Sequence, residues 1–324
     1  MRRRQFLSAL AAAGAAAPVS AWAQARLPVI GLMATGKVTS KANVDAFLQG
    51  MAGLGYVSGN NVVIEARYSE GDNALWPSLA AELVALSPRV IVSGTTTSHL
   101  ALKNATATIP IVMASGPDAV GNKIVASLSN PGGNITGVQS PPSIIVSKQV
   151  ELAHTLVGGV APLGVVLNTS SVTHQTNLDE AMKAAAAVGR PCVPVDWERT
   201  RDALQQAFQT LVNSRVAIAV VPTDSAIAAE SVGVIALAAA IRLPVVYGSL
   251  PLVVQGGLAS YGVKTEPGFS RAAVFVDKIL KGAKPADLPV EMMDPWMAIN
   301  INTAKALGLA VPVSVLTLAD QVIE

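Results

Sequence analysis

Cysteine and aromatic residues are scarce in this chain of 324 residues: it has one cysteine, and aromatic residues make up 4% of it. A lone Cys192 cannot form an internal disulfide. Its apolar setting in the segment GRPCVPV, at the start of an expected strand, predicts a buried thiol that fills space in the core. Any binding site must therefore be built without a disulfide framework and with very few aromatic side chains.

Long apolar runs without charge are also lacking beyond the N-terminal segment. No later stretch of about 18 apolar residues is free of charge, so we expect no membrane span. Neither sign of charge is in large excess. Without Arg2, Arg3 and Arg4, the Lys and Arg count falls from 23 to 20 against 21 Asp and Glu, a net charge near −1. This balance gives no reason to expect a nucleic-acid partner.

The first 23 residues have the pattern of a cleaved export signal. Arg2 to Arg4 supply positive charge, residues 6–19 are apolar and rich in alanine, and Ala21-Trp22-Ala23 is a small-x-small cleavage site. The segment RRQFL resembles the twin-arginine signature, and an ordinary secretory signal with three arginines is the alternative. No cysteine lies at the cleavage site to carry a lipid. We expect an exported, soluble protein of the periplasm that is not lipid-anchored.

Strands and helices are predicted to alternate along the rest of the chain. Short apolar runs favour strands and helical spacing of apolar residues favours helices. The first half has predicted strands at 28–33, 62–68, 90–93 and 109–114 and helices at 43–54, 75–86 and 98–107. The second half has strands at 163–167, 193–196, 216–221 and 244–247 and helices at 176–188, 201–212 and 225–241. This order predicts an α/β protein with parallel sheets covered by helices on both faces.

The two halves repeat the same order of elements. Pro28 and Pro162 precede equivalent strands and are 134 residues apart, as are Pro110 and Pro244. About 300 mature residues suffice for two domains with separate cores. We therefore expect two pseudo-duplicated lobes, each a parallel sheet with helices on both faces.

Small, polar loops follow six of the predicted strands. Ligands of open parallel sheets bind at the carboxyl ends of the strands, and helix N-termini there offer free N–H groups to a carboxylate. Each loop alone is also explained by ordinary helix capping, so the prediction of a site rests on their convergence. The candidate ligand-binding residues in these loops are Thr35, Thr96, Thr97, Ser115, Asp118, Asn168, Thr169, Asp224 and Ser249.

Catalytic motifs are missing. The chain has no G-x-S-x-G, no phosphate-binding G-x-x-x-x-G-K-[ST], no G-x-G-x-x-G after the first strand and no H-E-x-x-H. His99, His154 and His174 lack metal-ligand spacing. We expect a binding protein with no metal and no cofactor. An exported enzyme that uses Asp118 and Asp224 as paired carboxylates is the alternative.

Several segments resemble the bacterial ABC-transporter substrate-binding family that includes tryptophan- and tyrosine-uptake components. They include LGYVSGNNVVIEARYSEGD, ATATIPIVMASGPDAVG, VASLSNPGGNITGV and LPVVYGSLPLVVQGGLASYGV, and the match runs from about Leu27 to Glu324. The resemblance implies a periplasmic binding protein-like fold of type I whose lobes are joined by a three-stranded hinge. The chain would cross near 137–140, 261–263 and 291–296, so that lobe 1 comprises 26–139 with 262–290 and lobe 2 comprises 140–261 with 291–324.

The resemblance also implies a function. The lobes would close on a small carboxylate-bearing ligand, an aromatic or branched amino acid, and a monomer would deliver it to an ABC permease in the inner membrane. By the same resemblance Tyr247 joins the candidate binding residues. The family often has aromatic residues where Pro222 to Ile227 stand here, which leaves a smaller amino acid or another carboxylate open. A periplasmic sensor that presents the ligand to a receptor is a further alternative.

Overall fold

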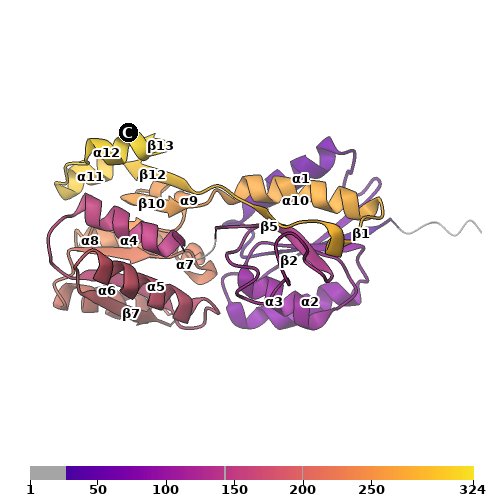
Figure 1. Ribbon diagram of the computed structural model, residues 1–324, viewed down its shortest axis with the longest axis horizontal. Coiled ribbons are helices and arrows are strands. Elements are labelled where there is room, and N and C mark those ends of the chain that lie inside the picture. The colour runs from indigo at the N-terminus through magenta and orange to yellow at the C-terminus, as the bar shows by residue number, and fades with distance from the viewer. Residues whose placement is uncertain (1–26, 142–143, 199) are drawn as a thin grey trace, which may run out of the picture.

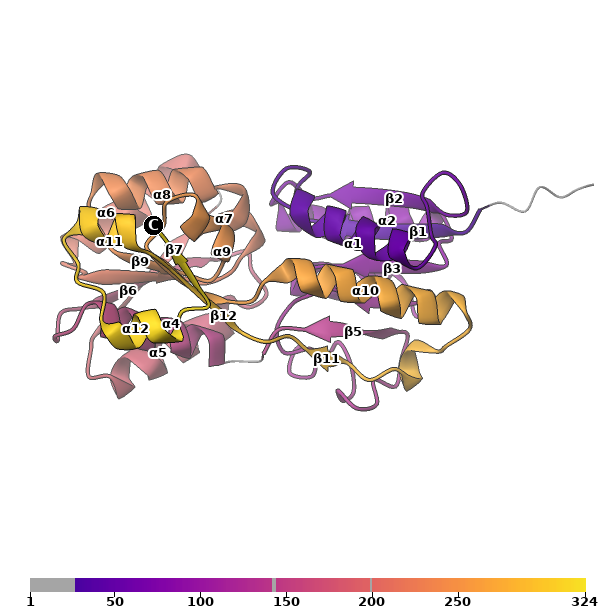
Figure 2. The same cartoon turned by 90° about the horizontal axis from the view of Figure 1, so that it is seen from above.

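The computed structural model describes residues 27–141, 144–198 and 200–324. The expected signal peptide, residues 1–23, lies outside these ranges. Figures 1 and 2 show two α/β lobes side by side along the longest axis, each with its own sheet and helices. The predicted fold class is confirmed.

The first lobe contains a six-stranded sheet in the order β11-β5-β4-β3-β1-β2. All neighbouring strands run parallel. The bounds are β1 Val29–Ala34, β2 Val63–Tyr68, β3 Val90–Ser93, β4 Ile111–Met113, β5 Ile135–Gln139 and β11 Glu291–Met292. Its helices are α1 Lys41–Gly53, α2 Trp76–Ala85, α3 Thr96–Ala105 and α10 Thr265–Leu280, with short 3-10 turns η1 Asn73–Leu75 and η2 Pro285–Asp287.

Alternating side chains of the first sheet supply two separate apolar clusters. Ile30 and Leu32 of β1 pack on the side of α1 and α10, whereas Met33 packs with Trp76 on the side of α2 and α3. This alternation follows from the two-residue period of a strand. Helix α10 comes from late in the chain yet lies against α1, as both views show (Figures 1 and 2).

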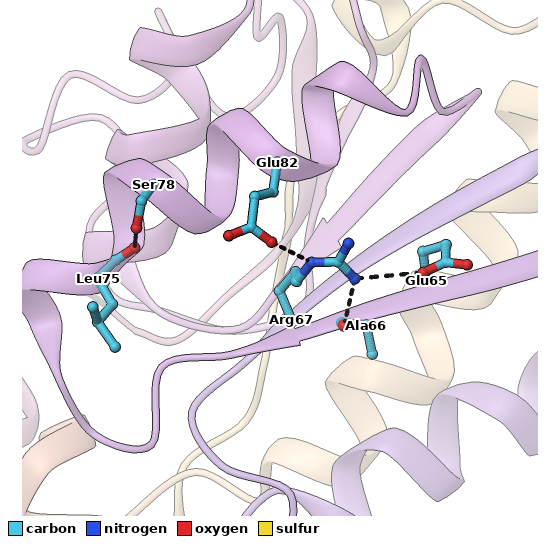
Figure 3. A network of polar contacts seen from close by, with 6 residues as sticks. All are labelled: Glu65, Ala66, Arg67, Leu75, Ser78 and Glu82. Atoms are coloured by element: carbon cyan, nitrogen blue, oxygen red, sulfur yellow. Dashed lines mark hydrogen bonds and ion pairs between the residues drawn. The ribbon is translucent and has the colours of Figure 1, made fainter.

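Helix α2 is also tied to the edge of this sheet by polar contacts (Figure 3). Arg67 of β2 donates from Nε to Glu82 of α2 at 2.8 Å and from a terminal nitrogen to the carbonyl oxygen of Ala66 at 3.0 Å. Ser78 donates to the carbonyl oxygen of Leu75 in the first turn of α2. Because the carboxylate of Glu82 is exposed, the ion pair contributes modestly, up to about 1 kcal/mol.

The second lobe contains a seven-stranded sheet in the order β13-β12-β10-β9-β8-β6-β7. Its strands are β6 Leu163–Asn168, β7 Cys192–Trp197, β8 Ile218–Val221, β9 Val245–Tyr247, β10 Ala259–Gly262, β12 Trp296–Asn300 and β13 Gln321–Ile323. The pair β10–β12 is antiparallel, which departs from the expected all-parallel sheet. The reason is the connectivity, because β12 enters this lobe directly from the first lobe and not through a crossover helix.

Eight helices of the described residues belong to this lobe: α4 Ile144–Leu156, α5 His174–Ala187, α6 Arg201–Asn213, α7 Ser225–Ala229, α8 Ser231–Ala240, α9 Leu250–Val254, α11 Ile301–Leu307 and α12 Val313–Leu318. The single helix predicted at 225–241 is thus two helices. Glu230 separates them, with φ −96° and ψ 18°. Apolar clusters lie on both faces of the sheet, as in the first lobe.

The chain crosses between the lobes three times, close to the predicted positions. The crossings join the end of β5 to α4, the end of β10 to α10, and the end of β11 to β12. One expected boundary is corrected: Glu291 and Met292 pair with Val138 and Gln139 of β5, so they extend the first sheet and do not begin the second lobe.

Two further expectations concern Cys192 and the membrane. Cys192 begins the edge strand β7 and is half-buried, because an edge strand is less covered than a central one; burial raises the pKa of its thiol. The expectation of a fully buried thiol was therefore wrong in degree. Among the described residues, no helix has the length and apolar character that crossing a membrane requires.

Candidate functional site

A cleft with a volume of about 300 Å³ lies between the two lobes. All six predicted loops contribute to its lining, through residues 35, 94–97, 115–118, 171, 222–225 and 248–250. Two of the crossings add residues 140–141 and 262–266. The convergence of the loops was therefore predicted correctly, and the cleft has the small size that suits a metabolite.

Seven of the ten candidate binding residues line this cleft: Thr35, Thr96, Thr97, Ser115, Asp118, Asp224 and Ser249. The other three do not. Tyr247 is 2% exposed and belongs to the apolar core behind the loop, and burial raises the pKa of its phenol. Thr169 is exposed, and its N–H donates to the carbonyl oxygen of Trp197.

Asn168 is the third residue outside the main cleft. Its side chain makes hydrogen bonds within the second lobe. Its amide nitrogen donates to Asp224 at 2.9 Å, and its amide oxygen accepts from the N–H and hydroxyl of Ser170. Asn168 instead borders a small cavity of about 10 Å³ beside the main cleft. Asn168, Thr169 and Tyr247 thus do not line the main cleft, and their predicted part in ligand binding stays a prediction.

The N-terminus of α3 opens onto the cleft. Thr95 and Ser98 form a capping box, in which each side chain accepts from the backbone N–H of the other residue. Thr96 and Thr97 occupy the first helical turn and line the cleft. The hydroxyl of Thr96 is enclosed and has no hydrogen-bond partner among the described residues. This helix end can therefore offer N–H groups and a hydroxyl to an anion.

Asp224 caps the N-terminus of α7 on the opposite side. Its Oδ1 accepts from the N–H of Ala226 at 2.8 Å, from that of Ile227 at 3.4 Å and from the amide of Asn168. One carboxylate oxygen of Asp224 is thus occupied by hydrogen bonds that cap α7 and hold Asn168. Asp224 supports the loop at the cleft as well as lining it.

Asp118 has an unusual backbone conformation for a non-glycine residue. Its φ is 49°, in the left-handed region, and its Oδ1 accepts from the N–H of Gly121 at 2.8 Å. Strained residues of this kind persist where the surroundings hold them, often at binding sites. Asp118 lines the cleft from the first lobe.

The cleft also contains residues that sequence analysis missed. Gln149 of α4 is 0% exposed, Glu180 lies on α5, and Lys264 lies in the second crossing. Gln149 and Glu180 are on helices and not at the ends of strands, so a search of strand-end loops does not find them. Glu180 projects from the same helix as Thr176 and Asn177, which also line the cleft.

Negative charge dominates the cleft. Its described lining includes the carboxylates of Asp118, Glu180, Asp224 and Glu266 against one cation, Lys264. The ammonium of Lys264 lies 3.5 Å from the ring centroid of Trp296, a cation–π contact. Burial raises the pKa of Glu180 to about 7, and the charge of Asp118 adds to the rise.

The three histidines play no part in this lining. His99 is fully buried and donates from Nε2 to the carbonyl oxygen of Ser93 at 3.0 Å, and burial lowers its pKa to about 4. His174 pairs with Asp196 at 2.7 Å. In the described part of the chain, no group of three or more His, Cys, Asp and Glu side chains is arranged to hold a metal ion.

Comparison with known proteins assigns the chain to a family. The profile described as ABC transporter substrate binding protein matches residues 36–323. The chain belongs to this family. A tyrosine-binding protein of Clostridioides difficile (strain R20291) is 30% identical over 264 residues, which are 81% of this chain and 75% of that protein. Because the relatives are substrate-binding proteins, the expectation of a non-enzymatic protein is confirmed.

Two solved structures are similar to this substrate-binding protein over almost its whole length. An ABC domain from Streptococcus pneumoniae in complex with L-Trp has a TM-score of 0.82, is 29% identical and covers 92% of this chain and 100% of its own. A ligand-free, open substrate binding protein from Clostridium difficile has a TM-score of 0.65, is 25% identical and covers 92% of this chain and 99% of its own.

The two lobes make direct contacts with each other, so the cleft between them is closed. The hydroxyl of Ser225 at the start of α7 donates to Oδ1 of Asn73 in the first lobe at 2.7 Å. Gly71 of the first lobe lies against Ala229 of α7, so closely that a Cβ at position 71 would be 2.7 Å from that of Ala229. The lobes therefore touch away from the three crossings as well as at them.

Proposed function

We propose that this substrate-binding protein captures an L-amino acid between its two lobes and delivers it to an ABC permease of the inner membrane. The protein works in the periplasm as a monomer after removal of residues 1–23. The observation that carries the proposal is the small inter-lobe cleft, lined by strand-end loops of both lobes, in a member of the ABC substrate-binding family. Ligand contacts from both lobes favour the closed state, because either lobe alone offers half of them.

The α-carboxylate is held in this proposal at the N-terminus of α3. The donors are the N–H groups of Thr96 and Thr97 and the hydroxyl of Thr96, which has no hydrogen-bond partner within the described ranges. Ser115 and Thr35 lie on neighbouring loops of the same lobe. A helix N-terminus favours an anion through both its free N–H groups and its dipole.

Two observations bear on the side chain of the amino-acid ligand, and they favour different answers. Relatives are named as a tyrosine-binding protein and as a complex with L-Trp. The described lining of this cleft contains no aromatic side chain, and its apolar part consists of aliphatic residues such as Ile145, Val146 and Leu252. We propose an apolar amino acid, with aromatic and branched side chains both within the class.

The test is mass spectrometry of small molecules released from the purified mature protein, followed by calorimetric titration with the standard L-amino acids. We expect an apolar amino acid to be released unchanged and to rebind. Binding of carboxylates that lack an amino group, with no amino acid bound, would replace the proposed ligand class. Conversion of the released compound into a product would contradict a binding role.

A further inference from the structure

The buried groups of the cleft that lack partners include an acceptor at the hinge. Gln149 is 0% exposed, and its amide nitrogen donates to the carbonyl oxygen of Tyr261 at 2.8 Å, next to the second crossing. Its amide oxygen is enclosed and has no hydrogen-bond partner in the described ranges. An enclosed amide oxygen without a donor costs free energy, so a ligand N–H at this place is favoured.

Glu180 is a second acceptor without a partner. No hydrogen bond or ion pair joins it to any other described residue, although it is partly buried on the cleft side of α5. Asp118 lines the same cleft from the first lobe, and one of its two carboxylate oxygens is engaged with Gly121. Two carboxylates that approach across a closing cleft repel each other, and a cation between them removes the repulsion.

We propose that Asp118 and Glu180 form one cation subsite that spans the two lobes and favours closure around a ligand bearing an ammonium group. The inference rests on the proposed function and deepens it. Glu180 acts from the second lobe and Asp118 from the first, so the subsite is complete in the closed state. It selects amino acids against deaminated carboxylates of the same shape, because these leave both carboxylates without a counter-ion.

The subsite makes binding depend on pH. The pKa of Glu180 is raised to about 7 by burial and then by Asp118, and an ammonium ligand favours the ionised form. Affinity therefore falls as pH falls below about 7.

Other charged and titratable groups lie on α5 and on the elements packed against it. They are Asp179, Lys183, the pair His174–Asp196, the pair Lys148–Glu151, and His154 of α4. Asp224, Lys264 and Glu266 share the cleft.

Calorimetric titration of the mature protein with each standard L-amino acid and its deaminated acid tests the subsite. We expect the wild-type protein to bind an amino acid and to reject its deaminated counterpart. Glu180→Gln should weaken the amino acid by at least about tenfold. Asp118→Asn, which keeps an acceptor for Gly121, should do the same. Asp179→Asn is the matched control on α5 and should keep wild-type affinity, because Asp179 is exposed and bonds Gln175.

Proton release separates a direct role of Glu180 from a structural one. At pH 7 the wild-type protein should release a fraction of a proton for each ligand bound, because a ligand ammonium beside Glu180 lowers the raised pKa of its carboxyl. Glu180→Gln should release none. Titrations in two buffers with different ionisation enthalpies measure this.

The outcomes distinguish the subsite from the proposed function. An amino acid bound equally well by wild type and Glu180→Gln, with unchanged proton release, would overturn the subsite and leave the function standing. Binding of deaminated acids alone would overturn the subsite and the amino-acid ligand together. Absence of binding to every compound would overturn both proposals.

Discussion

At the scale of single residues, the cleft is lined by buried polar groups that have no hydrogen-bond partner among the described residues. Thr96 is the clearest example, because its hydroxyl is buried at the N-terminus of α3 and has no hydrogen bond within the described residues. A hydroxyl of this kind contributes little to the free energy of unfolding of the ligand-free protein. It contributes to the free energy of binding when a ligand supplies the missing hydrogen-bond partner.

Thr96→Val keeps the shape of this side chain and removes the hydroxyl. We expect ligand affinity to fall by about two- to tenfold, since a neutral hydrogen bond contributes about 0.5–1.5 kcal/mol. The free energy of unfolding of the ligand-free variant should stay near that of the wild type. Calorimetric titration and urea unfolding measure the two quantities. Thr155→Val on the exposed face of α4 is the control, and a similar loss of affinity there would contradict the assignment.

Asp224 caps helix α7 as well as lining the cleft, so its substitution is tested first by its effect on stability. Since its Oδ1 caps α7, Asp224→Ala should lower the free energy of unfolding by about 0.5–2 kcal/mol whether or not the residue contacts a ligand. Asp224→Asn keeps an acceptor for the cap and should be closer to wild type in urea unfolding. An alanine variant as stable as wild type would contradict the capping role.

Sequence analysis found the candidate site where polar residues follow strands, and it failed where the residue lies elsewhere. Asp118 and Thr96 follow strands, so the rule for parallel sheets predicts them. Gln149 and Glu180 lie within helices, and their place in the cleft depends on how α4 and α5 pack in the second lobe. Tyr247 ends a strand, but the alternation of side chains turns its ring into the core. One residue of register decides between cleft and core.

At the scale of elements, the alternation of strands and helices was predictable because apolar periodicity and glycine at helix ends are local signals. Gly55 and Gly189 follow α1 and α5 with φ of 88° and 69°, as helix stops require. The antiparallel strand β12 was not predictable from local pattern, because it depends on where the chain crosses. The assignment of residues 262–290, which include α10, to the first lobe came from the family resemblance and not from local pattern.

Gly137 in β5 is a position within a strand where a side chain does not fit. Its φ is 129°, and a Cβ there would collide with the backbone of Met113 in the neighbouring strand β4. Gly137→Ala should destabilise the protein by about 1–3 kcal/mol, because neither strand can move without disturbing the sheet. Thermal unfolding measures this. Gly133→Ala is the control, since a Cβ at Gly133 meets no atom within 4 Å, and equal stability of the two variants would contradict the account.

At the scale of the whole molecule, the contact between Asn73 and Ser225 holds the lobes together at a distance from the hinge. Oδ1 of Asn73 accepts from Ser225 of the second lobe at 2.7 Å and from the indole of the buried Trp76 at 3.1 Å. Trp76 thereby fixes the orientation in which Asn73 meets the other lobe. Because this contact joins the two lobes, it stabilises the closed state and not an open one.

Ser225→Ala removes the donor of this inter-lobe contact without disturbing Trp76. We expect the closed population to fall and ligand affinity to decrease by about two- to tenfold, mainly through faster dissociation. Stopped-flow dissociation measures the rate. Ser314→Ala, at an exposed position of α12 outside the lining of the cleft, is the control in the same lobe. Unchanged dissociation in Ser225→Ala would show that the contact does not favour closure.

The central claim is that two lobes close on an amino acid, and small-angle X-ray scattering of the mature protein tests it most directly. Curves are measured without ligand and with the amino acid identified by titration, at saturation. The account predicts a smaller radius of gyration with ligand, approaching that of the closed structure described here. Identical curves in the presence of demonstrated binding would contradict closure as the basis of capture.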